Sequence, residues 1–223
     1  PFKEKLFITM INGYKFSNHN KVGELYTNRI EALNYFSDKD CDLYGTGWNK
    51  CMDRKILDIY KGEVKSKNAT LKNYKFSICF ENTSNEYGAI MEKIFDCFAA
   101  GCVPIYLGAP NIDVYIPKKC FIDFRDFDTY DGLYHFLKEI SESEYDQYIE
   151  SIKEFMASDE YDDFNEIGYI RYMESAINKV MGSAIVERGA LNLKMEWIKK
   201  ILVNPNIFWD KAGLKMLLKL VFS

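Results

Sequence analysis

Residues 74–108 read YKFSICFENTSNEYGAIMEKIFDCFAAGCVPIYLG, and this stretch decides the fold. Its first seven residues form an apolar and aromatic run that is typical of a buried strand. Apolar residues then recur at helical spacing from Ile90 to Gly101. A second apolar run follows at 102–108. A strand, a helix and a strand joined this closely predict a parallel βαβ unit.

The sequence before and after this unit extends the same pattern. Apolar runs at 6–11, 41–45 and 120–124 predict three more strands. Apolar residues at i, i+4 and i+7 within 23–36 predict a helix between the first two of these strands. The chain is therefore expected to be an α/β protein with a Rossmann-like, mostly parallel sheet.

Beyond the last expected strand the pattern is helical. Asp128 or Thr129 is placed to cap one helix, and Ser141 has capping-box spacing with Glu144 for the next. We expect one α/β domain over residues 1–182, which the resemblance described below makes the nucleotide-sugar binding domain, followed by a helical carboxyl-terminal extension over residues 183–223.

The extension is basic and amphipathic. Residues 191–223 hold six Lys against one Glu and one Asp, and apolar residues from Leu214 to Val221 share one helical stripe. This pattern is typical of a helix that lies on an anionic membrane. It is equally typical of a helix whose apolar face packs on protein while its lysines face water, so both interpretations stay open.

The composition is typical of a globular protein and excludes two kinds of binding site. The chain has 223 residues, 48% of them hydrophobic, which is ample for a packed core. A net charge of −4 argues against nucleic acid as a partner. Six Cys without a C-x-x-C motif, and only two His, argue against a metal site.

The same features indicate a cellular setting. Several of the cysteines lie in apolar segments, which indicates buried, reduced thiols and a cytoplasmic protein. If the basic tail binds lipid, the protein would be peripheral on the inner face of a membrane. The chain begins at Pro1 and enters a strand almost at once, so we expect it to be a piece of a longer protein.

Polar residues crowd the junction where strand 74–80 gives way to the helix. Glu81 and Asn82 end the strand, Gly88 lets a ligand approach the backbone, and Lys93 lies in the first helical turn. A helix N-terminus carries about half a positive charge, and Lys93 adds to it. The junction suits a diphosphate, although these residues could equally cap a loop and face solvent.

A second loop favours the nucleotide interpretation. GAPNIDVYIP, residues 108–117, follows the next strand and should face the loop 81–89 at the carboxyl edge of a parallel sheet. That edge is where open α/β sheets bind ligands. The chain lacks both the P-loop and the dinucleotide glycine motifs, so a different nucleotide site is indicated.

Four motifs in order, YKFSICFEN, EK, AAGCVPIYLGAPNIDVYIP and FIDFRDF, resemble the carboxyl-terminal domain of the α-1,3-fucosyltransferases, glycosyltransferase family 10. The resemblance covers about residues 6–157. It implies one half of a GT-B arrangement, in which this half binds GDP-fucose and an amino-terminal domain binds the acceptor glycan. It also implies inverting transfer of fucose to a glycan hydroxyl, with no cofactor, no D-x-D metal site and a catalytic base outside this chain.

The resemblance assigns roles by position. Lys93 and Arg29 match the family residues that contact the donor diphosphate. Glu92 matches the glutamate beside the donor sugar and is the catalytic candidate. Glu81 and Asn82 match the Glu-Asn pair of the donor loop.

Tyr87, Gly108 and Asn111 complete the expected donor-binding set. The sequence departs from the family pattern at Ala89, where the family has Tyr, and at Met91, where it usually has Thr. Tyr87 stands two places early and substitutes for the family Tyr only if the loop is rearranged. These departures leave two alternatives open: a GT-B transferase for a different nucleotide sugar, and a non-catalytic nucleotide-binding fragment.

Overall fold

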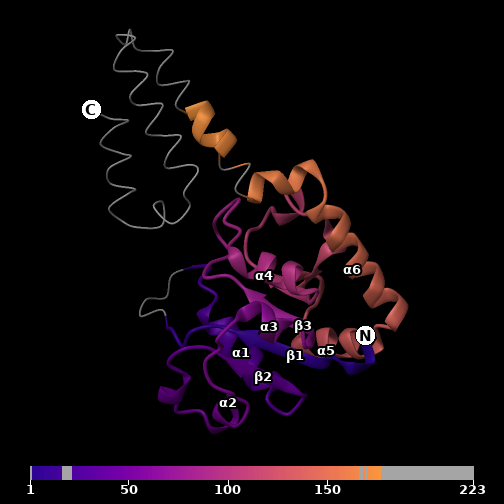
Figure 1. Cartoon of the computed structure of the whole chain (residues 1–223). Helices are drawn as coiled ribbons and strands as arrows, with labels where there is room; N and C mark the ends of the chain where they lie inside the picture. The colour runs from indigo at the N-terminus through magenta and orange to yellow at the C-terminus, as the bar shows by residue number, and fades with distance from the viewer. Residues whose placement is uncertain (1, 17–21, 166–167, 169, 177–223) are drawn as a thin grey trace, which may run out of the picture. The chain divides into compact units, whose positions relative to one another are not determined.

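The protein is described by a computed structural model, which covers residues 2–16, 22–165, 168 and 170–176 (Figure 1). These residues form a five-stranded sheet with the order β2-β1-β3-β4-β5, and every neighbouring pair is parallel. The strands are β1 (Leu6–Ile11), β2 (Cys41–Tyr44), β3 (Tyr74–Phe80), β4 (Val103–Leu107) and β5 (Ile122–Asp123). The predicted parallel α/β sheet is confirmed, with β4 and β5 shorter than expected.

The shortening of β5 has a local cause. The carboxylate of Asp123 accepts hydrogen bonds from the backbone N–H of Arg125 at 3.0 Å and from its guanidinium at 2.6 and 2.8 Å. This side-chain cap starts a 3-10 turn at Phe124, where an extended strand was predicted.

Helices cover both faces of the sheet (Figure 1). The chain moves from β1 to β2 in one direction and from β3 to β4 in the other, so right-handed crossovers place the intervening helices on opposite faces. The helices are α1 (Tyr26–Phe36), α2 (Arg54–Asp58), α3 (Lys67–Leu71), α4 (Glu92–Ala100), α5 (Tyr130–Glu139) and α6 (Glu142–Met156).

Strand β3 shows why the sheet needs cover on both sides. Its side chains alternate between the two faces. Phe80 contacts the ring of Phe124, with ring centroids 5.3 Å apart. Cys79 faces the other way, with its Sγ 3.3 Å from the Sγ of Cys97 on α4. Because both faces are buried, the strand reads as a continuous apolar run in the sequence.

The predicted caps are confirmed. Thr129, and not Asp128, caps α5 by accepting the backbone N–H of Gly132 at 3.1 Å. Ser141 and Glu144 form the full capping box at the start of α6. Gly101 ends α4 in the left-handed conformation, which lets the chain turn directly into β4.

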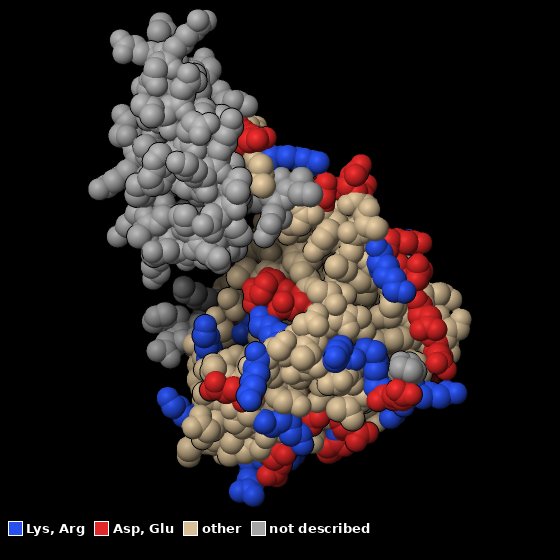
Figure 2. Space-filling view, in the orientation of Figure 1, with Lys and Arg blue, Asp and Glu red and all other residues tan. Residues whose placement is uncertain are grey.

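The six cysteines are buried and none forms a disulfide. The face shown in Figure 2 carries interspersed charges of both signs, and acidic residues gather along α6. No described helix is both long enough and apolar enough to span a bilayer.

The chain divides into two compact units, residues 1–158 and 159–223. The first contains the whole sheet and all six helices named above. The expected boundary between residues 182 and 183 and the basic segment 191–223 lie outside the described residues, so both stay predictions.

Candidate functional site

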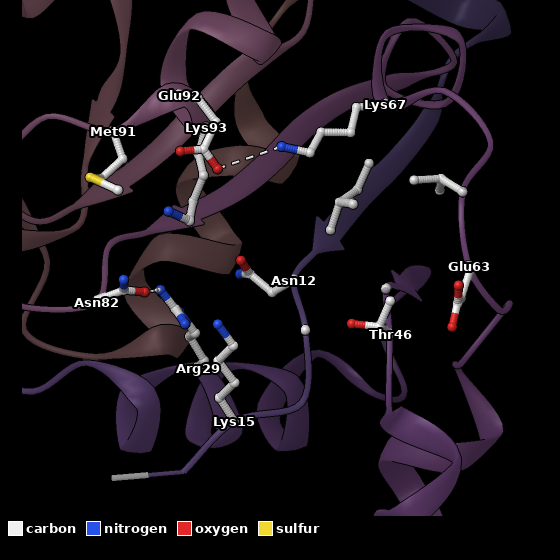
Figure 3. Close-up of a pocket in the computed structure, with 14 residues that line it drawn as sticks. Asn12, Lys15, Arg29, Thr46, Glu63, Lys67, Asn82, Met91, Glu92 and Lys93 are labelled. Carbon is white, nitrogen blue, oxygen red and sulfur yellow. Dashed lines mark hydrogen bonds and ion pairs between the residues drawn. The ribbon is translucent and has the colours of Figure 1, made fainter. Parts of the chain in front are cut away.

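A cavity of about 420 Å³ opens at the carboxyl edge of the sheet, where β1, β2 and β3 end (Figure 3). The strand order reverses between β1 and β3, and open α/β sheets bind ligands at this kind of switch point. Among the predicted site residues, those in its wall are Arg29, Asn82, Glu92 and Lys93. The structure therefore brings together residues from α1, from the loop after β3 and from α4.

Arg29 is fixed in the wall of the cavity by the end of β3. Its side chain is buried, and its Nε and Nη2 donate to the carbonyl oxygen of Phe80 at 3.1 and 2.8 Å. Nη2 also donates to Oδ1 of Asn82 at 2.9 Å. Burial lowers the pKa of Arg29 from its ordinary value, but a guanidinium still stays charged at neutral pH. The result is a rigid positive charge beside the cavity.

Lys93 is held by a carboxylate that lies beneath the cavity. Oε2 of Glu81 is 2.7 Å from Nζ of Lys93, and the two side chains are 2% and 13% exposed. Oε1 of Glu81 accepts the backbone N–H of Met91 at 2.9 Å, at the start of α4. Glu81 therefore positions both the ammonium of Lys93 and the helix N-terminus. It does not itself line the cavity.

Glu92 lies in the cavity wall and faces a lysine from α3. Its Oε1 is 3.5 Å from Nζ of Lys67, which also pairs with Asp96 at 2.8 Å. Partial burial alone would raise the pKa of Glu92, but the backbone N–H at the helix start and the charges of Lys93 and Lys67 lower it. Glu92 is therefore an ionised carboxylate at neutral pH, facing the space that a ligand would enter.

The second predicted loop supports the first without reaching the cavity. Oδ1 of Asn111 accepts the backbone N–H of Gly88 at 2.9 Å, which confirms that the two loops face each other. Gly108 packs against Glu81 so closely that an added Cβ would lie 2.5 Å from its Cγ. Tyr87 is 78% exposed. Among the described residues, the cavity wall does not include Tyr87, Gly108 or Asn111. Their predicted contacts with the donor nucleotide therefore stay predictions.

Sequence reasoning missed several wall residues: Asn12, Lys15, Thr46, Glu63 and Lys67. A usable signal exists for one of them. Asn12 directly follows the first strand and precedes Gly13, which is the same strand-end pattern that pointed to Glu81 and Asn82. The others come from loops and a short helix that only the folded chain brings to this edge. Across the described residues, no group of three or more His, Cys, Asp or Glu side chains is arranged to hold a metal.

Comparison with known proteins places the chain in a family. The profile of glycosyltransferase family 10 (fucosyltransferase), carboxyl-terminal part, matches residues 8–170. The chain belongs to this family. The resemblance predicted from the four motifs is thereby confirmed, over nearly the same range.

Individual relatives agree with the family assignment. The α-(1,3)-fucosyltransferase FucT of Helicobacter pylori is 40% identical over 75 residues, which are 34% of this chain and 16% of the relative. The mouse 4-galactosyl-N-acetylglucosaminide 3-α-L-fucosyltransferase 9 is 36% identical over 145 residues, which are 64% of this chain and 35% of the relative.

A solved structure agrees as well. A crystal structure of an α1,3-fucosyltransferase with GDP is similar, with a TM-score of 0.50 and 26% identity, over 66% of this chain and 38% of that one. The chain therefore spans well under half the length of each of these relatives.

Proposed function

We propose that this chain is the donor-binding part of an inverting α-1,3-fucosyltransferase, which transfers fucose from GDP-fucose to a hydroxyl of an acceptor glycan. The observation that carries the proposal is the convergence of Arg29, Lys93 and the N-terminus of α4 on one cavity at the switch point of the sheet. Fixed positive charge at a helix N-terminus is suited to a diphosphate. The similarity to a fucosyltransferase that was crystallised with GDP supports the same ligand.

In the reaction, this positive charge stabilises the leaving group, GDP. The acceptor oxygen attacks the anomeric carbon of fucose from the side opposite GDP, and the bond from that carbon to the phosphate oxygen breaks. Negative charge grows on the diphosphate, where Arg29, Lys93 and the helix N-terminus stabilise it. Glu92 is ionised and faces the positive charge of the sugar ring. The acceptor proton passes to a general base.

We assign that base and the acceptor site to another domain of the complete enzyme. The chain covers 38% of the solved fucosyltransferase with GDP and 35% of the mouse relative, which leaves ample sequence in both for a second domain. The donor needs no cofactor in this proposal, because the protein's own cations neutralise the diphosphate.

A transferase that uses a different nucleotide sugar is the second candidate. Met91 lines the cavity where the family usually has Thr, and Ala89 replaces a family Tyr. Both changes lie in the loop that leads to Glu92, so they would alter the sugar end of the site more than the diphosphate end.

Two further proposals concern setting and partners. We propose a cytoplasmic protein, which six buried cysteines without a disulfide support. We also propose peripheral contact of residues 191–223 with an anionic membrane, which their six lysines support.

Calorimetric titration with GDP, GDP-fucose and UDP tests the main proposal. Binding of GDP and GDP-fucose but not of UDP is the expected result. Preference for a GDP-sugar other than GDP-fucose would favour the second candidate. If no guanine nucleotide binds the chain, its role as a donor-binding part is wrong.

A further inference from the structure

The cavity wall contains a carboxylate that the roles assigned above do not use. Glu63 lines the cavity and is exposed, so a ligand can reach its side chain. Its carboxylate has no hydrogen-bond or ion-pair partner among the described residues. The other carboxylate of the wall, Glu92, is paired with Lys67. Because an unpaired carboxylate repels phosphate, Glu63 is unsuited to the diphosphate and is available to another part of the ligand.

The backbone next to Glu63 is fixed at the carboxyl edge of the sheet. The segment 59–62 runs parallel to the end of β2. The backbone N–H of Gly45, directly after β2, donates to the carbonyl of Gly62 at 3.0 Å. Gly62 has a φ of +101°, a conformation that favours glycine, and it ends the stretch that runs beside β2. Glu63 follows directly, so the sheet itself sets its place at the cavity.

The cavity has two sides of different character. Figure 3 shows Glu63 and Thr46 on one side, and Arg29 and Lys93 on the other. In the proposed function the two cations hold the diphosphate, and Glu92, next to Lys93, faces the sugar. The diphosphate of a nucleotide sugar separates that sugar from the nucleoside. The base is therefore left with the side of the cavity that Glu63 and Thr46 line.

Guanine has the edge that suits a carboxylate on this side. Its N1–H and its 2-amino group are neighbouring donors, so the two oxygens of one carboxylate can accept both hydrogen bonds at once. Adenine, cytosine and uracil do not present two adjacent donors on one edge. Ile11 and Val64 also line the cavity, and apolar side chains of this kind suit the flat faces of a base.

We propose that Glu63 selects guanine, by accepting hydrogen bonds from N1–H and from the 2-amino group of the base. The inference rests on the proposed function, because that function supplies the nucleotide and places its phosphates at Arg29 and Lys93. Positive charge alone cannot choose a base, since every nucleoside diphosphate carries the same phosphates. A site built to accept a particular N–H rejects an analogue that lacks it, so Glu63 gives the cavity the discrimination that its cations lack.

Calorimetric titration with GDP and with inosine diphosphate (IDP) tests this role, because IDP differs from GDP only in lacking the 2-amino group. Wild-type protein should bind IDP about ten- to a hundred-fold more weakly than GDP, since one carboxylate oxygen loses its donor. Glu63→Gln keeps the size of the side chain but replaces one acceptor oxygen with an amino group. This variant should bind GDP and IDP about equally. Its midpoint of thermal unfolding should stay that of wild type, because Glu63 has no partner among the described residues.

Asp58 offers a matched control for the loss of one negative charge. It lies in α2, its carboxylate pairs with Arg54 at 3.1 Å, and it does not line the cavity. Asp58→Asn changes the net charge by the same amount as Glu63→Gln, and it should leave the affinities for GDP and IDP unchanged. An equal loss of the preference for GDP in both variants would mean that net charge, and not contact with the base, is responsible, and it would contradict the inference.

The outcomes separate this inference from the proposed function. If wild-type protein binds GDP and IDP equally well, or if Glu63→Gln keeps the full preference for GDP, the carboxylate does not read the base. The inference is then wrong, and the proposed function stands. If wild-type protein binds neither nucleotide, the proposed function fails and this inference fails with it.

Discussion

At the scale of single residues, the site depends on a buried ion pair. Glu81 is 2% exposed, and it joins Lys93 to the backbone N–H of Met91 at the start of α4. Removing one member of such a pair leaves an uncompensated buried charge, whereas replacing both members is often tolerated. Lys93 therefore stabilises the fold through Glu81, and this effect can be separated from the donor binding that we propose for it.

We expect Lys93→Ala to lower the free energy of unfolding by about 3–5 kcal/mol, because it leaves the carboxylate of Glu81 buried without a partner. Chemical denaturation measures this change. The double variant Glu81→Gln, Lys93→Met should recover most of the stability and still bind GDP about 1.5–3 kcal/mol more weakly than wild type in calorimetry. Unchanged GDP affinity in the double variant would remove Lys93 from the donor site.

Gly108 also matters at the scale of single residues, because its neighbours leave no room for a side chain. An added Cβ would lie 2.4 Å from Oη of Tyr106 and 2.5 Å from Cγ of Glu81, and both side chains are buried. We expect Gly108→Ala to lower the free energy of unfolding by about 1–3 kcal/mol in urea denaturation. Gly132→Ala in α5 is the control: an added Cβ there would lie at an ordinary contact distance of 3.5 Å from Oγ1 of Thr129, so the substitution should be neutral or stabilising. Equal effects of the two substitutions would contradict the packing argument.

At the scale of elements, the start of α1 decides where Arg29 points. Oε2 of Glu24 accepts the backbone N–H of Tyr26 at 2.8 Å and that of Thr27 at 3.3 Å. The hydrogen bond from the hydroxyl of Thr27 is the largest cause that lowers the pKa of Glu24 below its ordinary value. Arg29 lies one turn further along the helix, so a frayed first turn would loosen the guanidinium.

The pH dependence of this cap follows from the sign of the shift. A carboxylate with a lowered pKa in the folded state stabilises the protein above its unfolded pKa, and that stability is lost as the pH falls. Wild type should therefore be more stable than Glu24→Gln by about 0.5–2 kcal/mol at neutral pH. The difference should shrink as the pH falls below the ordinary value of 4.5. Urea denaturation of both proteins from pH 7 to pH 3 measures it, and a constant difference would contradict the cap.

At the scale of the whole molecule, the doubly wound topology creates the site. The reversal of strand order between β1 and β3 leaves the ends of these strands uncovered, since the helices that follow them go to opposite faces. The cavity lies at that reversal. The chain beyond this unit carries the basic segment 191–223, whose six lysines motivate the membrane proposal.

We expect the chain to co-sediment with vesicles that contain anionic lipid, and to do so less at high salt, because screening weakens the attraction of the lysines. Replacing Lys211, Lys215 and Lys219 with Gln should reduce the bound fraction. Neutral vesicles are the control. A lack of binding to anionic vesicles at low salt would overturn the membrane proposal and favour packing of this segment on protein.

The sequence by itself determined the order of the strands, the parallel βαβ unit, the capping box at Ser141 and the family, whereas it left Asp128 and Thr129 open as the cap of α5. These features are local or depend on ordered motifs, so hydrophobic periodicity and residue type are enough to reveal them. Even the two facing loops followed, because parallel strands put their carboxyl ends at one edge.

Only the tertiary structure decided how the site is built. It showed that Glu81 supports Lys93 from below the cavity, that Arg29 is held by the end of β3, and that Glu63 lines the same cavity. These relations join residues from 29 to 93, on different elements. Sequence spacing carries no information on which of those side chains meet, because burial and hydrogen-bond partners are set by the packing of the whole sheet and its helices.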